Sequence, residues 1–170
     1  LQQVLQQHGL KAGDVKRVTA LVHQGAIDVL GPVTDPQTVH QSKFSMGTVL
    51  GLVAVLGRAG LTEFDTSFKS GEVTSFHDKV VMELDPEVDG AYPARWIGKV
   101  RVDTRDGRVL HGRVDEPKGD PGNTLTRPEL EDKALRLALY HGGASEAEMR
   151  AAMQSLWGIA TQAQVGRLLP

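Results

Sequence analysis

The sequence predicts an α+β fold: a two-layer sandwich of an antiparallel-rich sheet and helices, with extra helices at both chain ends. Three observations lead to this prediction. Apolar and polar residues alternate in about four short segments, an Asp-Gly pair joins two of them, and residues 44–58 carry apolar side chains almost all the way round a helix. A sheet with one apolar face needs a covering layer, and a helix that is apolar on every side needs to be buried. We therefore expect the helices to pack on the apolar face of the sheet.

The first quarter of the chain predicts a strand between two helices. Residues 1–8 have the pattern of a helix end, and residues 14–22 alternate as a half-buried strand does. Residues 24–30 are expected to form a short helix. The Gly-Pro and Asp-Pro pairs within 31–36 predict a loop after it.

The strongest helix is predicted over residues 44–58. Gly47 and Gly51 lie four residues apart on it, and this spacing lets another backbone approach closely. In a helix of a water-soluble domain we interpret it as tight packing. Shorter helical pieces, broken at residues 70–71, are expected over 61–79.

A block of β structure follows. Residues 80–84 alternate, and Trp96, Val100 and Val102 share one face of a second predicted strand. The pair at 106–107 predicts a hairpin turn, because aspartate and glycine tolerate positive φ, and residues 108–114 return as the partner strand.

Two capping boxes predict the last two helices. Thr126 with Glu129 opens a helix expected to reach about residue 141, and Ser145 with Glu148 opens one expected to reach about 157. We expect residues 13–142 to form the α+β domain, and residues 1–12 and 143–170 to be helical segments at its two ends.

Composition narrows the classes of function. The chain of 170 residues has no cysteine and a formal net charge of −2, with both signs mixed. Disulfides and thiolate nucleophiles are therefore excluded, and neither a nucleic-acid nor a membrane partner is expected. The most apolar run, 46–56, is far short of the ~20 residues that cross a bilayer. We expect a cytoplasmic protein, with no metal site, because none of the six histidines pairs with another at helical ligand spacing.

The segment from His40 to Ser45 is the first candidate site. Lys43 and Ser45 stand before the predicted buried helix, whose first amides carry partial positive charge. Lysine beside a helix N-terminus can hold a carboxylate. From the residues alone, the favoured interpretation is simpler: Ser45 caps the helix, and Lys43 extends along it.

The polar loop of residues 115–123 is the second candidate. It places one lysine, Lys118, among acidic, proline and glycine residues. A lid loop that brings Lys118 to an acidic ligand is one interpretation. A solvated connection between strand and helix is the favoured one.

Five basic residues lie on the predicted hairpin, and a basic hairpin can indicate RNA binding. They are Lys99, Arg101, Arg105, Arg108 and Arg113. Aromatic residues make up only 5% of the chain, and no stacking pair falls on adjacent strands. A solvated face of the sheet is therefore the favoured interpretation.

Taken together, the two candidate segments resemble blocks of the MmgE/PrpD family. His-Gln-Ser-Lys-Phe-Ser at 40–45 is similar to that family's A-K-F-S block, with a small, apolar helix after it. Residues 105–108 and 115–126 resemble its D-G-R hairpin and P-K-G-D-P-x-N-P-L-T loop, and residues 129–133 its E-L-x-x-K. Gly122 and Thr124 depart from the pattern, the second replacing a usual proline. The ordered series spans residues 13 to 157.

The resemblance implies a lid domain that closes over a small di- or tricarboxylic acid, in a lyase of the 2-methylcitrate dehydratase class. The family's acid/base residues would lie mainly in an all-helical domain outside this chain, so the chain alone is expected to be inactive. Lys43, Phe44 and Ser45, with His40 and Lys118, would contact the substrate. No cofactor is implied, and a homodimer is expected.

Other activities and roles remain open. The same blocks occur in decarboxylases and epimerases of the family, so the resemblance does not fix the substrate acid. A non-catalytic packing or dimerisation module is the competing class of function.

Overall fold

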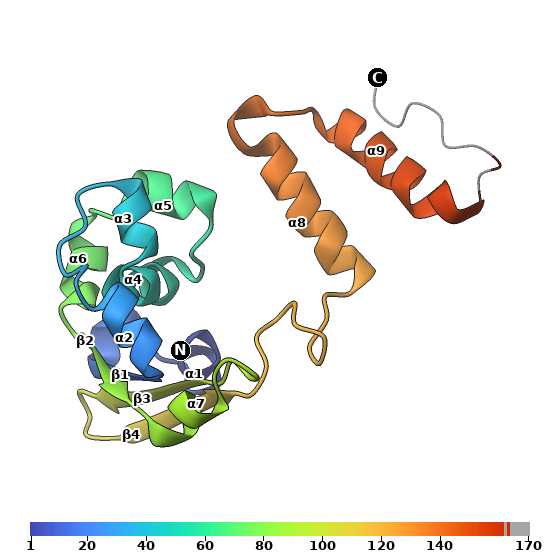
Figure 1. Cartoon of the computed structure of the whole chain (residues 1–170). Helices are drawn as coiled ribbons and strands as arrows, with labels where there is room; N and C mark the ends of the chain where they lie inside the picture. Colours follow the sequence, from blue (N-terminus) through green and yellow to red (C-terminus); the bar gives the residue numbers. More distant parts are fainter. Residues whose placement is uncertain (162, 164–170) are drawn as a thin grey trace. The chain divides into compact units, whose positions relative to one another are not determined.

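The computed structural model describes residues 1–161 and 163. The chain divides into two compact units, an N-terminal unit, Leu1–Gly122, and a C-terminal unit, Asn123–Pro170. The α+β class expected from the sequence is confirmed, with helices at both ends of the chain (Figure 1).

A four-stranded mixed sheet forms the base of the N-terminal unit. The strand order is β2-β1-β3-β4, with bounds Val15–Val22 (β1), Val80–Leu84 (β2), Gly98–Thr104 (β3) and Val109–Val114 (β4). Two of the three pairings are antiparallel. The pairing of β1 with β2 is parallel, with Val18 opposite Val80, and Val18 also lies opposite Val102 of β3.

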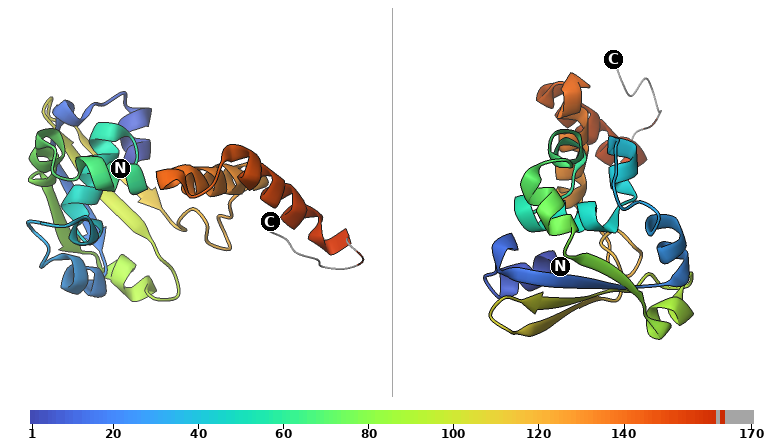
Figure 2. Two further views of the ribbon diagram at one scale, coloured as in Figure 1. Left: turned by 90° about the horizontal axis from the view of Figure 1, so that it is seen from above. Right: turned by 90° about the vertical axis from the view of Figure 1, so that its left-hand side faces the viewer.

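Helices form the second layer of this unit. Figures 1 and 2 show α3 to α6 on one face of the sheet. The helical elements are α1 (Gln2–Gln7), the 3-10 turn η1 (Ala12–Asp14), α2 (Gln24–Leu30), α3 (Val39–Lys43), α4 (Met46–Leu56), α5 (Leu61–Ser67), α6 (Gly71–His77) and α7 (Pro86–Ala91).

Two apolar clusters join the layers. The larger contains Val18 and Val102 from the sheet and Phe76 from α6, all at most 1% exposed. The smaller contains Leu52, Phe64 and Val73, within the helical layer. Close packing of α4 on α6 was expected from its two glycines. A Cβ atom on Gly51 would lie 2.9 Å from the carbonyl oxygen of Val73 in α6.

Three features differ from the expectation or add to it. The helix expected over 44–58 begins at Met46, because Ser45 caps it and the separate five-residue helix α3 ends at Lys43. Helix α7 was not predicted, although Asp85 caps it and Pro86 occupies its first turn. The strand order was likewise not predicted.

The C-terminal unit is a pair of capped helices. It contains α8 (Arg127–Leu139), the 3-10 turn η2 (Tyr140–Gly142), α9 (Glu146–Gly158) and η3 (Ile159–Thr161). Both predicted capping boxes are present. The guanidinium of Arg127 lies 4.7 Å from the centre of the Trp157 ring. Among the described residues of this unit, Met153 is the only buried apolar side chain.

No single helix in the described part of the chain is long and apolar enough to span a bilayer. Helices α4 and α5 meet that test only when counted together, and they are bent by 101° to one another.

Candidate functional site

The junction between α3 and α4 contains four of the five residues predicted to contact a ligand. Thr38 begins α3, and its hydroxyl accepts a hydrogen bond from the Gln41 amide at 3.1 Å. Ser45 begins α4 in the same way, accepting from the Thr48 amide at 3.4 Å. The two caps lie seven residues apart, and between them His40 and Lys43 of α3 are exposed whereas Ser42 is buried.

Exposed cationic and aromatic groups meet on this junction. The rings of His40 and Phe44 lie 5.1 Å apart, and Phe44 is 41% exposed. The Lys43 ammonium lies 5.8 Å from the centre of the Phe64 ring, a cation–π contact that favours this direction of the side chain. Lys43 is exposed as well. The junction therefore has a cation, an imidazole and an aromatic ring exposed on the surface of the N-terminal unit.

The N-terminus of α4 itself is closed. Ser45 is 1% exposed, and its side-chain oxygen serves as the cap. Gly47 is buried beneath the His77 ring, and a Cβ atom on Gly47 would lie 2.3 Å from the nearest carbon of that ring. Ser45 is placed as a structural residue, in agreement with the favoured interpretation of the sequence. Lys43 ends α3 and does not lie in the first turn of the long helix.

Lys118 lies on an exposed part of the loop after β4. The loop turns at Gly119, whose φ of +108° suits glycine, and the Asp120 amide donates to the Pro117 carbonyl at 3.1 Å. The two segments predicted to contact a ligand, 40–45 and 115–123, are each followed by or contain a residue that lines one shared cavity. Met46, next to Ser45, and Pro117, next to Lys118, line the same cavity of about 340 Å³, while Lys43 and Lys118 are not among its lining residues.

An aromatic cluster borders this cavity, and sequence reasoning missed it. The rings of His23 and Tyr92 stack at 4.0 Å, and Trp96 meets Tyr92 edge-on at 5.0 Å. Nδ1 of His23 accepts from the Ala26 amide at 3.2 Å, so this imidazole caps α2. The signal was a histidine directly before a short predicted helix. His23 and Trp96 line the cavity itself, together with apolar residues of α1, α4 and the sheet.

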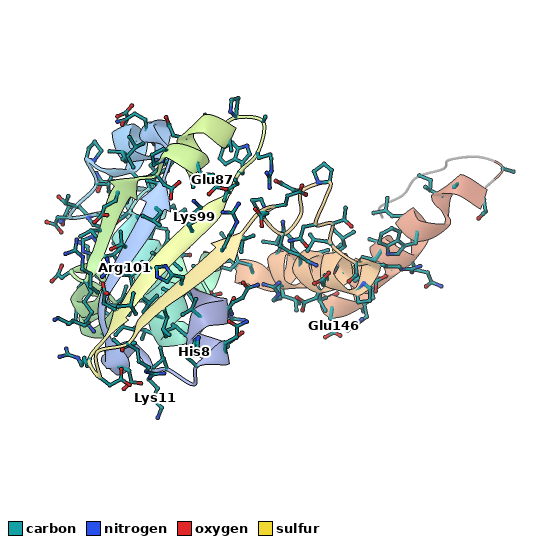
Figure 3. All side chains as sticks on the ribbon, turned by 90° about the horizontal axis from the view of Figure 1, so that it is seen from below. His8, Lys11, Glu87, Lys99, Arg101 and Glu146 are labelled. Carbon is teal, nitrogen blue, oxygen red and sulfur yellow. The ribbon has the colours of Figure 1, made fainter. Side chains whose placement is uncertain are left out.

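The cations at the rim of the cavity are paired with carboxylates. Lys99 lies 2.9 Å from Asp85 and 2.5 Å from Glu87, and Arg113 lies 2.7 Å from both Glu87 and Asp115. Arg113 and Lys99 hold the pKa of Glu87 at about 2, below its ordinary value of 4.5. We name this series the ion-pair chain; Arg95 extends it, at 3.2 Å from Asp115. Figure 3 shows Glu87 and Lys99 together at one end of the sheet.

The other basic residues of the hairpin are also neutralised or bound to the backbone. Arg101 lies 2.8 Å from Asp103, Arg108 lies 2.8 Å from Asp106, and Arg105 donates to the Gly13 carbonyl at 2.9 Å. Such alternation of charge supports the interpretation of a solvated sheet face. In the described residues, no three histidine, aspartate or glutamate side chains are grouped so that they could hold a metal ion.

The comparisons with known proteins identify a family. A search of the curated proteins returns no match to this sequence. The model of the MmgE/PrpD C-terminal domain matches residues 1–159. This match covers both candidate segments, the hairpin and both helices of the C-terminal unit. The chain therefore belongs to the MmgE/PrpD family, and it corresponds to the family's C-terminal domain.

Proposed function

We propose that this domain closes over a small di- or tricarboxylic acid in a lyase of the 2-methylcitrate dehydratase class. The observation that carries the proposal is the exposed Lys43 ammonium, held over the Phe64 ring within the family's Lys-Phe-Ser block. A lysine directed by an aromatic ring loses less rotational freedom when it binds a carboxylate. The neighbouring His40 and Phe44 supply a further polar group and an apolar contact.

The chemistry assigns this domain to substrate binding. Dehydration next to a carboxylate needs a base that removes the α-proton and an acid that assists the leaving hydroxyl group. Lys43 would hold one carboxylate and lower the energy of the enolate that forms when the proton leaves. The acid and base themselves are expected from the all-helical domain that the family resemblance implies, so the isolated chain is expected to be inactive.

Lys118 is a second proposed contact, carried by the loop after β4. The ion-pair chain reaches Asp115, the first residue of that loop, through Arg113 at 2.7 Å. This supports a loop whose first residue is held by an ion pair. Ser45 serves the proposal indirectly, because its cap holds Phe44 and Lys43 at the surface.

Binding of citrate to the chain tests the proposal. We expect weak binding, with NMR amide shifts gathered at residues 40–45, because one exposed charge pair contributes only about 0.2–1 kcal/mol. Lys43→Ala should weaken binding up to about fivefold, which is the same energy range expressed as a ratio. Lys69→Ala is the matched control, since Lys69 also lies over a phenylalanine ring, 5.7 Å from Phe68.

The alternative outcomes separate the other classes of function. A packing or dimerisation module would leave the amides of residues 40–45 unmoved by citrate. In a complete enzyme carrying this domain, Lys43→Ala should lower kcat/KM for 2-methylcitrate about tenfold, with both a higher KM and a lower kcat, because Lys43 would hold a carboxylate of the substrate and also stabilise the enolate. Turnover is followed by the ultraviolet absorbance of the new double bond, and unchanged kinetics would refute the role of Lys43.

A further inference from the structure

A groove of about 910 Å³ lies at the other end of α4 from the Lys43 junction. It is lined by the segment Leu10–Gly13, by Ala54 and Val55 near the end of α4, and by residues of α6 and its C-terminal end. Helix α4 has 11 residues, so its two ends are about 16 Å apart. The groove is therefore separate from the proposed substrate contacts.

Lys79 at the end of this groove is a half-buried cation without a carboxylate partner among the described residues. An ammonium has three N–H donors. The one hydrogen bond found for the Lys79 ammonium in the described part of the chain goes to the Ala12 carbonyl at 3.2 Å, and the ammonium lies 5.3 Å from the centre of the Phe76 ring. Lys99, by contrast, contacts two carboxylates.

A second cation flanks the same turn. Arg105 donates from Nε to the carbonyl of Gly13, the residue after Ala12, at 2.9 Å. Burial lowers the pKa of Lys79, and the positive charge of Arg105 lowers it further. Two like charges that converge on η1 destabilise one another, and an anion between or beside them would relieve the repulsion.

The remaining lining of the groove indicates the shape of such an anion. Among the described residues that line the groove, Lys11 is the second cation beside Lys79, and Glu72 on α6 is the one acidic residue. Figure 3 shows Lys11 at the end of the sheet opposite Glu87 and Lys99. Leu10, Ala54 and Val55 provide an apolar wall, with the buried Phe76 behind it. A ligand pocket of this kind is apolar with a few placed polar groups.

We propose that this groove binds a small organic anion, with a carboxylate or phosphate group at Lys79 and a short apolar body against the end of α4. Neither the family match nor the Lys43 junction assigns a ligand here. The site would therefore act beside the proposed substrate site, as a second point at which a metabolite contacts the domain.

Titration of the chain with phenyl phosphate and phenylacetate tests this proposal. We expect NMR amide shifts at residues 10–13, 54–55 and 75–79, and the tighter of the two probes identifies the head group. Inorganic phosphate, which lacks the apolar body, and benzyl alcohol, which lacks the charge, should each bind more weakly. Equal binding of inorganic phosphate would overturn the role of the apolar wall, and no shift with either aromatic anion would overturn the site.

Variants separate a ligand contact from a structural one. Lys79→Gln should weaken phenyl phosphate or phenylacetate binding about tenfold, the loss of one charge-assisted bond. Lys79→Arg keeps the charge and should keep binding, which guards against a Lys79→Gln variant that fails to fold. Lys69→Gln is the control, because Lys69 also bonds a neutral oxygen, that of Gln37 at 3.0 Å. Equal losses in Lys69→Gln or Lys43→Ala would overturn the assignment.

Discussion

Gly51 sets the distance between α4 and α6. A Cβ atom there would stand 2.9 Å from the Val73 carbonyl oxygen and 3.2 Å from a Val73 methyl carbon. The first contact is with backbone, which cannot rotate away as a flexible side chain can. The glycine is needed for space, in a helix where alanine would otherwise be favoured.

Gly51→Ala should therefore destabilise the fold. Overpacking costs about 1–3 kcal/mol, and the better helix propensity of alanine offsets about 1 kcal/mol, so a net loss of up to about 2 kcal/mol is expected in urea unfolding. Gly90→Ala is the matched control: Gly90 also lies in a helix, α7, and has nothing within 4 Å of its Cβ position. It should be neutral or stabilising. Equal effects of the two variants would contradict the packing argument.

At the same scale, sequence reasoning found part of the candidate site. Lys43 and Phe44 could be selected because a lysine and an aromatic residue directly before an apolar helix can be recognised within a few residues of sequence. Lys79 and Arg105 could not, because 26 positions separate them and only the sheet and η1 bring both to one turn. His40, Lys43, Phe44 and Lys118 stay predictions as ligand contacts.

Among the elements, α7 and the β3–β4 hairpin are held together by the ion-pair chain. Asp85 caps α7 with its carboxylate and also contacts Lys99, while Glu87 in the first turn contacts Lys99 and Arg113. One short helix is thereby tied to two strands. The arrangement fixes the start of the loop that carries Lys118.

This chain of charges predicts a stability loss in acid. The folded-state pKa of Glu87 is about 2, below its ordinary 4.5, so its contribution is complete above pH 4.5 and is lost as the pH falls toward 2. In Glu87→Gln, thermal stability should depend less steeply on pH in that window. Glu72→Gln, which removes an exposed carboxylate without an ion pair in the described chain, should keep the slope of the parent protein. A slope unchanged by Glu87→Gln would rule out the contribution.

Most elements follow from local sequence, and the exceptions have physical reasons. Strand β1, the hairpin and the capped helices α8 and α9 carry complete signals within a few residues. The separation of α3 from α4 was missed because the apolar Phe44 was assigned to the long helix, although Ser45 after it is the cap, and the Thr38–Gln41 capping box was overlooked. The parallel pairing of β1 and β2 depends on partners about 60 residues apart, which no local pattern encodes.

At the scale of the whole molecule, the two units differ in how much they bury. All the buried polar residues and all the buried apolar ones except Met153 lie in the N-terminal unit, among the described residues. In the C-terminal unit, Leu137, Leu156 and Trp157 remain 44–49% exposed. Local stability follows buried apolar contact, so the two units should open at different free energies.

Hydrogen exchange on the full chain can measure this difference. Amides of β1 and β3 should be protected far longer than those of α8 and α9, because the strands are closed on both sides and pack on the larger apolar cluster. The amides of α4 provide the internal reference, as a helix that packs in the N-terminal unit. Equal protection of α4 and α8 would show that the units unfold together.

The central place of β1 has a consequence for how the protein is made. Strand β1 ends at Val22, and its partners β2 and β3 begin at Val80 and Gly98, so 57 and 75 further residues must be synthesised before the two ladders can start to form. At roughly 5–20 residues per second, the delay is several seconds. During this interval the apolar face of β1 has only nearby helices to shield it, so the nascent protein should depend on chaperones that hold extended apolar segments.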